Sequence, residues 1–363
     1  MLVLTSLIGL QNADDCGRRV TDERHYSAPV SDTFSSDDVG VVQVRNSGYH
    51  TSVTIVHPSG LRDPYIGFLQ YRELTSTDGG KSWKTRSPLE RLGAIGSVRS
   101  SDLLQAPSND NFLYKLISET GTYLRSEDGG KTWLHPKYRI DNSSTEEFVA
   151  RHGGNSFYAA TFEPSAIDPR EPLTIYATIS VVPYASLVYF EGPLPRNDLP
   201  GMYVSHDGGD TWNIFSDALA NSSPLGISER NRGQLYGQTQ NGIVKSVDGG
   251  KTWSGVGQQQ LIAAVPKTRA NERSSHPVDL FELSQIMIDP SDDRTVYLIS
   301  NKGAYRSTDG GNQWRLLDFG FDEIGGTHSM AIDRMEPNEI YFGTSRGLYV
   351  SMDKGCHSRK IYP

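Results

Sequence analysis

Ser246-Val-Asp248-Gly-Gly250-Lys-Thr-Trp253 is one of five copies of a Ser-x-Asp-x-Gly-x-x-Trp motif, called the box below. The other four copies begin at Ser76, Ser126, Ser205 and Ser307. A sixth copy begins at Ser351 and has Ser358 in place of the Trp. Because one pattern recurs along so much of the chain, the sequence predicts a repeat architecture.

The residues around each box predict short β-strands. In the fullest unit we expect a strand ending at Ile288, a second over Thr295–Ser300, a third over Ala304–Ser307 and a fourth from Trp314. An Asp-Pro turn separates the first two strands, and the box is the turn between the last two.

A turn residue, usually Pro, stands seven positions before a strand Tyr in each unit. The Pro pairs are Pro58/Tyr65, Pro107/Tyr114, Pro169/Tyr176 and Pro290/Tyr297. Two units keep the spacing without the Pro, with Arg334 before Tyr341 and Glu229 before Tyr236.

Four strands in a repeat of about 40 to 60 residues predict an all-β fold, a single β-propeller. Six four-stranded blades fit residues 46–363, at about 46–90, 91–140, 141–217, 218–257, 258–318 and 319–363. Residues 1–45 are expected to be an N-terminal segment that closes the ring. The alternative is a degenerate seventh blade in those residues.

Composition excludes some classes of function. The chain has 363 residues, a net charge of -8 and no basic stripe, so we expect no nucleic-acid partner. No apolar run approaches the roughly 20 residues of a membrane span. The sequence suggests no cofactor, and it leaves the oligomeric state open.

The two ends of the chain bear on its compartment. Leu2–Leu10 is either the remnant of a secretory signal or an apolar strand. Because a propeller brings its termini together, Cys16 and Cys356 are predicted to form a disulfide in an oxidising compartment. In the cytosol they would be two separate thiols. We expect an extracellular or periplasmic location, with a cytoplasmic one left open.

The box resembles the Asp-box, or bacterial neuraminidase repeat, of sialidases, xyloglucan-cleaving glycoside hydrolases, sortilin-type receptors and photosystem II assembly factors. The resemblance implies a propeller superfamily rather than one activity. Ser and Asp can satisfy turn backbone groups, Gly-Gly permits positive φ, and Trp can pack back on the hairpin. A structural role is therefore expected for the carboxylates of Asp78, Asp128, Asp207, Asp248, Asp309 and Asp353.

Three blades carry extra length, at about residues 179–200, 134–155 and 254–279. These insertions fall between the second and third strands of a blade, or between one blade and the next. In an antiparallel blade both kinds of connection lie opposite the boxes, so we expect that face to bind the ligand.

The innermost strands are expected to begin at the same face, with two polar sets near the centre of the ring. The sets are His50, Arg99, Thr161, Asn221, Glu282 and Gly326, and Ser52, Ser101, Glu163, Ser223, Ser284 and His328. Aromatic and charged residues in the 179–200 insertion suit sugars or a peptide. The candidate ligand-binding residues are His50, Arg99, Asp102, Tyr184, Tyr189, Glu191, Arg196 and His328.

Two functions remain. The first is a propeller that binds a glycan or protein ligand. The second is an exo-acting, sialidase-like glycoside hydrolase, for which Glu163 and Glu282 are the candidate catalytic carboxylates. The Arg-Ile-Pro of sialidases is absent, and xyloglucan-cleaving enzymes use two propellers. No ligand spacing around His50 and His328 predicts a metal site.

Overall fold

A computed structural model describes the chain from residue 40 to residue 362, with gaps. The described ranges are 40–47, 50–62, 69–76, 84–85, 103–109, 111–117, 122–137, 139–140, 158–183, 202–219, 224–239, 241–257, 259–261, 283–300, 303–317, 327–334, 336–344 and 347–362.

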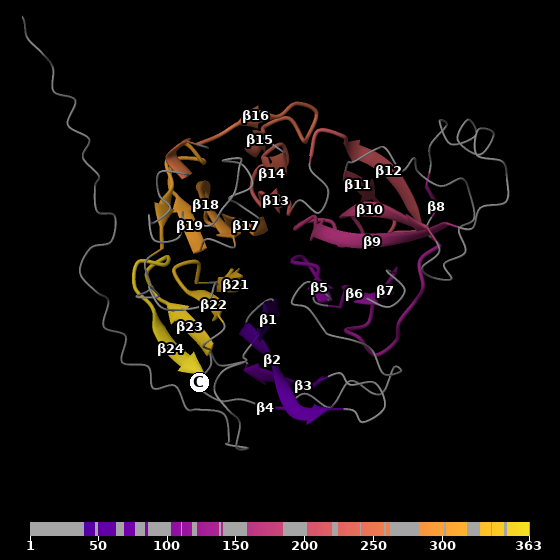
Figure 1. Cartoon of the computed structure of the whole chain (residues 1–363), viewed down its shortest axis with the longest axis horizontal. Helices are drawn as coiled ribbons and strands as arrows, with labels where there is room; N and C mark the ends of the chain where they lie inside the picture. Colours follow the sequence, from indigo (N-terminus) through magenta and orange to yellow (C-terminus); the bar gives the residue numbers. More distant parts are fainter. Residues whose placement is uncertain are drawn as a thin grey trace, which may run out of the picture.

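The described strands form six sheets that are arranged around a common centre (Figure 1). Within each sheet the strands pair in chain order and antiparallel, except that β8 of the third sheet pairs in parallel with β12. The first, fourth, fifth and sixth sheets have four strands each. From the centre outward we call the strands of every sheet A, B, C and, where it is described, D, with β8 as an additional outer strand of the third sheet.

The first three sheets follow in chain order, each written from the centre outward. The first is β1 (Gly40–Ser47), β2 (His50–Arg62), β3 (Leu69–Ser76) and β4 (Lys84–Thr85). The second is β5 (Leu103–Gln105), β6 (Leu113–Ile117) and β7 (Thr122–Ser126). The third is β9 (Tyr158–Ile167), β10 (Ile175–Pro183), β11 (Met202–Ser205), β12 (Thr211–Ser216) and β8 (Arg139–Ile140).

The last three sheets each have four strands. The fourth is β13 (Gly226–Ile227), β14 (Leu235–Thr239), β15 (Gly242–Ser246) and β16 (Ser254–Gly255). The fifth is β17 (Leu283–Asp289), β18 (Asp292–Ser300), β19 (Gly303–Ser307) and β20 (Arg315–Leu316). The sixth is β21 (Thr327–Ile332), β22 (Ile340–Thr344), β23 (Gly347–Ser351) and β24 (Arg359–Tyr362).

The strands predicted for the fullest unit are confirmed by the fifth sheet. β17 covers the expected end at Ile288, β18 and β19 cover the two middle strands, and β20 begins directly after Trp314. The box therefore connects strands C and D there, as the sequence predicts.

The first sheet differs from the expected pattern. Pro58 does not end a strand, because β2 continues through it to Arg62 with a register shift. Strand A is instead β1, most of which lies in residues 1–45, the range expected to be an N-terminal segment. β1 also contacts β21 and β22, so the first and last sheets are neighbours.

The third sheet carries an additional outer strand. β8 pairs in parallel with β12, Thr211 opposite Arg139 and Trp212 opposite Ile140. Part of the predicted 134–155 insertion thus runs along the rim of the third sheet and not on the face opposite the boxes.

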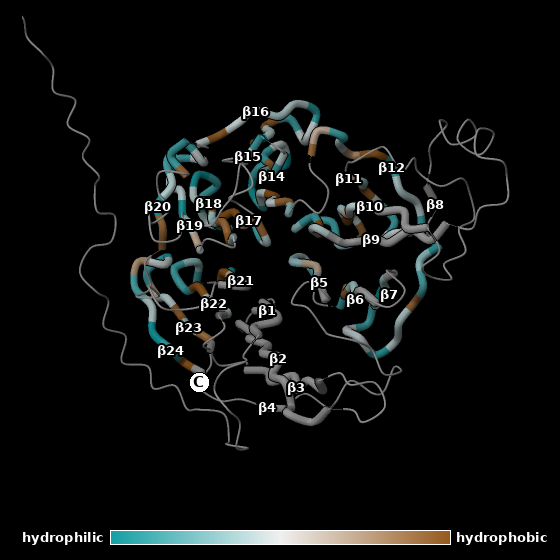
Figure 2. The backbone as a smooth tube through the Cα atoms, in the orientation of Figure 1, coloured by the Kyte–Doolittle hydropathy of each residue, from teal (hydrophilic) through white to brown (hydrophobic). Residues whose placement is uncertain are grey.

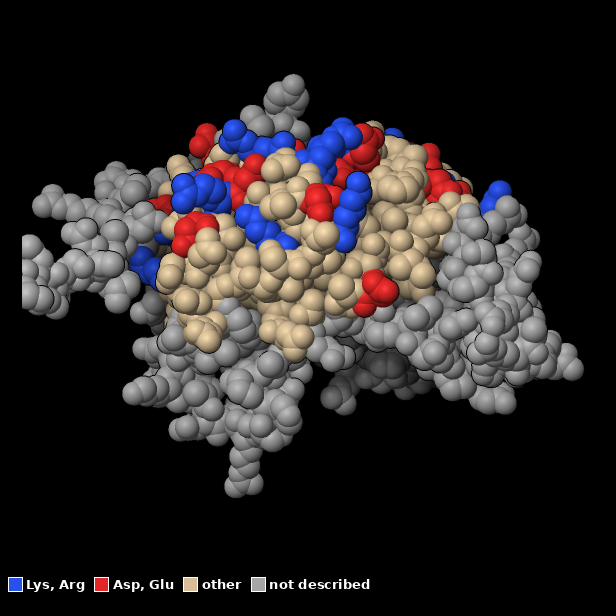
Figure 3. All heavy atoms as spheres, turned by 90° about the horizontal axis from the view of Figure 1, so that it is seen from above, with Lys and Arg blue, Asp and Glu red and all other residues tan. Residues whose placement is uncertain are grey.

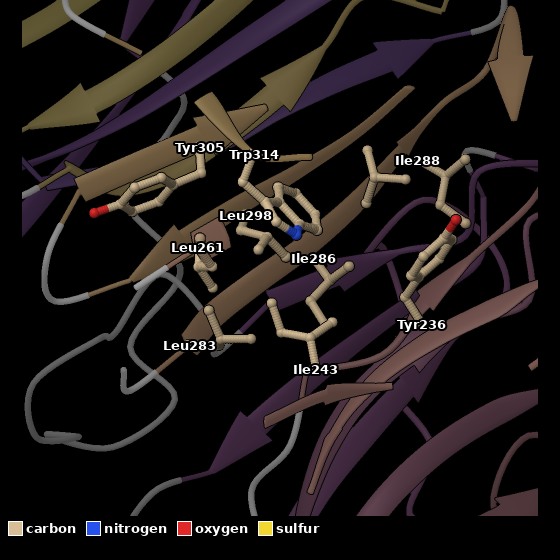
Figure 4. Packing of buried hydrophobic residues seen from close by; sticks show 10 residues of the cluster. Tyr236, Ile243, Leu261, Leu283, Ile286, Ile288, Leu298, Tyr305 and Trp314 are labelled. Atoms are coloured by element: carbon tan, nitrogen blue, oxygen red, sulfur yellow. The ribbon is translucent and has the colours of Figure 1, made fainter. Parts of the chain in front are cut away.

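The core lies between consecutive sheets. Strand A and B side chains of the fifth sheet, such as Ile286 and Leu298, pack against Tyr236 and Ile243 of the fourth (Figure 4). The remaining described clusters join the second sheet to the third, the third to the fourth, and the fifth to the sixth. Figure 2 shows the matching pattern, with apolar residues along the strands and polar residues in the turns. The second to sixth sheets are therefore stabilised by their neighbours rather than by a single shared core.

Within the ranges given above, no helix is long and apolar enough to cross a membrane.

Candidate functional site

The box is a closed network of hydrogen bonds. In the third sheet Asp207 Oδ1 accepts bonds from Ser205 Oγ at 2.8 Å and from the Thr211 amide at 2.8 Å. Asp207 Oδ2 accepts from Thr211 Oγ1 at 2.6 Å, and Ser205 Oγ accepts from the Gly209 amide at 2.7 Å. The boxes at Asp128 and Asp248 repeat this pattern. Both oxygens of each carboxylate are thus used inside the turn.

These hydrogen bonds favour the ionised carboxylates. Hydrogen bonds from Thr132 and Thr252 lower the pKa values of Asp128 and Asp248 to about 2. Burial alone would raise the pKa of Asp207, but the bonds from Thr211 and Ser205 outweigh it and lower that pKa. A carboxylate held in this way is a poor general acid or base at neutral pH.

The sixth box differs from the others at two further positions besides Ser358. Lys354 has a φ of 57°, where the other described boxes have Gly. Its Nζ lies 2.8 Å from Oδ2 of the fully buried Asp289 in the fifth sheet. His357 takes the place of Thr, and its Nδ1 lies 2.6 Å from Asp353 Oδ2. The last box is therefore joined to the preceding sheet by an ion pair.

Strand residues near the boxes also join consecutive sheets. Tyr236 Oη donates to the Gly310 carbonyl at 3.0 Å, and Tyr114 Oη donates to the Pro172 carbonyl at 2.8 Å. Arg306 Nη1 donates to the Lys354 carbonyl at 2.7 Å. Burial raises the pKa values of Tyr114 and Tyr236, so both stay neutral donors. The recurring strand Tyr that the sequence singled out is thus a link between sheets.

The A–B turns lie on the same side of the ring as the boxes, because strand direction alternates within each sheet. We call this the box side. In the sixth sheet, Arg334 Nη2 lies 2.7 Å from Glu229 Oε2 of the fourth sheet. Arg334 Nη1 donates to the Pro107 carbonyl of the second sheet. One guanidinium thus connects three A–B turns across the centre of the ring.

Charged side chains of both signs gather along one face of the molecule (Figure 3). The charged residues of the A–B turns include Arg170, Glu171, Glu229, Arg230 and Arg232. Among the described residues of this face the two signs are mixed.

Two of the predicted site residues lie within described strands, and His328 is near the strand end opposite the boxes. Glu163 lies in the middle of β9, paired with Thr178, and His328 is the second residue of β21. Both strands are innermost in their sheets. Ser284, in the innermost strand β17, is exposed, and its Oγ donates to the Ile299 carbonyl at 3.4 Å.

His50 is placed differently from its expected position. It pairs with Ser47 at the turn between β1 and β2, so it lies on the box side. The reason is that β2 is strand B, not strand A, of the first sheet. Its proposed part in a site on the opposite side therefore has no support.

The other predicted positions lie outside the described residues. They are Arg99, Asp102, Tyr184, Tyr189, Glu191, Arg196, Glu282, Asp78 and Cys16. Cys356 lies in the turn of the last box and is disulfide-bonded, and no described cysteine is free. Because Cys16 lies outside the described residues, its pairing with Cys356 stays a prediction. Among the described side chains, no three His, Cys, Asp or Glu residues are grouped as a metal site would require.

Arg334 and Glu229 were not predicted as partners, although the sequence carried a signal. These two residues stand where other units have the turn Pro, and their charges are opposite. Departure from the repeat marks both positions, but nothing local indicates that the two turns meet across the ring.

No protein-family model and no curated protein matches the chain. Solved structures do match. The GH74 xyloglucanase from Xanthomonas campestris is 14% identical, with a TM-score of 0.50, over 85% of this chain and 45% of that one. That likeness agrees with the arrangement of the sheets. The fold is a β-propeller.

Two further structures are less similar in shape. The GH74 enzyme of Niastella koreensis is 18% identical, with a TM-score of 0.46, over 85% of this chain and 45% of that one. YCF48 bound to D1 peptide is 13% identical, with a TM-score of 0.44, over 90% of this chain and 99% of that one. This propeller therefore spans 45% of the length of each of the two GH74 enzymes.

Proposed function

We propose that the chain is a six-bladed Asp-box propeller that binds a glycan or protein ligand through the side opposite the boxes. The observation that carries the proposal is the use of the box side for internal contacts. Its described box carboxylates at Asp128, Asp207 and Asp248 are engaged in their own turns. Arg334 spans its centre.

Chain length supports the same side. The connection between β10 and β11 runs from residue 184 to residue 201, and the segment before β17 covers residues 262–282. Both adjoin strand ends that face away from the boxes. Connections on a rigid scaffold commonly carry recognition. Our proposed contacts are Arg99, Asp102, Tyr184, Tyr189, Glu191, Arg196 and His328.

Binding to arrays of glycans and of short peptides tests this proposal. We expect wild type to bind a defined class of probe, and Tyr189→Ala with Arg196→Ala to weaken that binding about tenfold or more. Arg232→Ala is the matched control, because Arg232 is an exposed box-side arginine. The proposal would be contradicted if Arg232→Ala lost binding while the Tyr189→Ala, Arg196→Ala variant kept it, because the ligand would then bind on the box side.

The alternative is a glycoside hydrolase that uses Glu163 and Glu282. Glu163 lies on β9, the innermost strand of the third sheet, and this position near the centre of the ring supports the alternative. Hydrolysis would need two carboxyl groups about 5 Å apart for retention or about 6.5–9.5 Å apart for inversion.

A panel of 4-methylumbelliferyl glycosides, including the sialoside, separates the two functions. No turnover by wild type favours a binding module. Turnover that falls at least about a hundredfold in Glu163→Gln and Glu282→Gln favours the hydrolase. Turnover that neither substitution changes would remove both residues from the catalytic assignment.

A further inference from the structure

The hydrogen bonds of Arg334 join sheets that are not neighbours in the ring. Arg334 lies in the A–B turn of the sixth sheet and reaches the A–B turns of the second and fourth sheets. These three sheets alternate around the ring (Figure 1). By contrast, Arg230 donates to Ser291 and Ser228 to Asp293, both in the next sheet along the chain.

We propose that Arg334 is a cross-ring tie, which closes the centre of the propeller on the box side and fixes three alternate innermost strands relative to one another. The pairs between consecutive sheets can hold neighbours together while the ring as a whole widens or flattens. A bond across the centre opposes that motion directly. A ligand would then reach the centre from the opposite side, whatever its identity.

The chemistry of the contact suits this role. A guanidinium presents several donors in one plane, so it can bond a carboxylate and a carbonyl together, which an ammonium group does less well. The Arg334 and Glu229 side chains are 28% and 27% exposed, so water screens the pair only in part. The Pro107 carbonyl accepts the second bond, which holds the guanidinium in one orientation.

A second ion pair on the same side supplies a matched control. Arg232 Nη2 lies 3.6 Å from Glu171 Oε1, and the two side chains are 74% and 59% exposed. This pair joins the fourth sheet to the third, which are neighbours. It has the same charges as the proposed tie, but it has neither the burial nor the position across the ring.

A double-mutant cycle tests the tie. The variants are Arg334→Ala, Glu229→Ala and the double variant, each unfolded with urea in the full chain. We expect each single variant to lower the folding equilibrium constant about 10- to 100-fold, as loss of a charged hydrogen bond does. The double variant should lose little more than Arg334→Ala alone.

The control cycle uses Arg232→Ala and Glu171→Ala. We expect its coupling to be less than about threefold, as for exposed ion pairs. Additive effects at Arg334 and Glu229, or a coupling no larger than that of the control pair, would overturn the proposal.

A second set of variants covers the case in which Arg334→Ala does not fold. Arg334→Glu combined with Glu229→Arg exchanges the two charges across the ring. We expect this exchanged pair to be more stable than Arg334→Glu alone. Amide hydrogen exchange in the turns at 106–109 and 228–234 should be slower in the exchanged pair as well. Equal stability and equal exchange would contradict a direct tie between the turns.

Discussion

At the scale of single residues, the carboxylate of the box acts as a hub for its turn. Asp207 accepts from one side chain and one amide at Oδ1, and from the Thr211 hydroxyl at Oδ2. If the Asp207 carboxylate left the turn to contact a ligand, it would lose these three hydrogen bonds. The residue that repeats most regularly is thus committed to structure.

Asp207→Ala is expected to destabilise the protein by about 1–3 kcal/mol, because it removes acceptors from three donors. Asp217→Ala removes an exposed carboxylate directly after β12 and should change stability by less than about 0.5 kcal/mol. Urea midpoints of the two variants make the comparison. Equal midpoints would mean that the box carboxylate does not stabilise its turn.

The box also predicts a pH dependence. The pKa of Asp207 in the folded protein lies below its ordinary value of 3.8, so the ionised form stabilises the fold above about pH 4. This contribution is lost as the pH falls through the folded-state pKa. Thermal midpoints measured between pH 5 and 2, at fixed ionic strength, should fall less steeply in Asp207→Ala than in wild type. An identical slope in both proteins would contradict this assignment.

Lys354 offers a second residue-scale test. Lys354→Gly would relieve a φ of 57° but would leave the buried Asp289 without its ammonium partner. We expect a net loss of about 1–3 kcal/mol in urea unfolding. Adding Asp289→Asn should recover part of that loss, since no buried charge then remains. No recovery would show that the ion pair is not what holds Lys354 in place.

At the scale of elements, the second Gly of a box can lie against the preceding sheet, as Gly209 lies against Tyr123 of the second sheet. A Cβ on Gly209 would lie 1.4 Å from Tyr123 Oη, whereas a Cβ on Gly130 would lie 3.3 Å from Leu113 Cδ1, the nearest atom among the described residues. Both glycines have positive φ, of 99° and 87°. The two positions therefore share the backbone requirement and differ in the space available.

Gly130→Ala should cost about 1–2 kcal/mol from the left-handed backbone alone. Gly209→Ala should cost at least about 2 kcal/mol more, because Tyr123 is fully buried and cannot move away. Thermal unfolding of the two variants measures the difference. Equal losses would mean that the sheets do not approach at the boxes as described.

The sequence predicted those elements whose signals are local. Asp-Pro, the strand Tyr and the box together define the strands of the fifth sheet within a few residues. Pro58 misled the prediction for the first sheet, since a Pro in a bulged strand has the same local sequence as a turn Pro. The pairing of β8 with β12 depends on two segments about 70 residues apart and has no local pattern.

The candidate site was harder to predict than the fold. Glu163 and His328 do lie on innermost strands, because the count back from the A–B turn holds in those sheets. His50 does not lie on an innermost strand, because its position was counted back from Pro58, which lies inside β2 and not in the A–B turn. The contact between Arg334 and Glu229 joins residues 105 positions apart and depends on how the whole ring is arranged.

At the scale of the whole molecule, the ends of the chain should be joined. We predict a Cys16–Cys356 disulfide, which would accompany an extracellular or periplasmic location. A non-reduced digest examined by mass spectrometry should yield one peptide that contains both cysteines. Cys16→Ser should then cost about 2–5 kcal/mol relative to the oxidised protein. Two alkylated, separate thiols in the secreted protein would end this prediction.

We propose that the ligand binds the side of the propeller opposite the boxes. Amide hydrogen exchange, measured with and without the glycan or peptide that binds most tightly on the arrays, locates the binding side directly. We predict slower exchange in peptides from 184–201 and 262–282 and at the starts of β9 and β21, with no change in the boxes at 126–133, 205–212 and 246–253. Protection that appears in the boxes and A–B turns, while the opposite side is unchanged, would contradict the account.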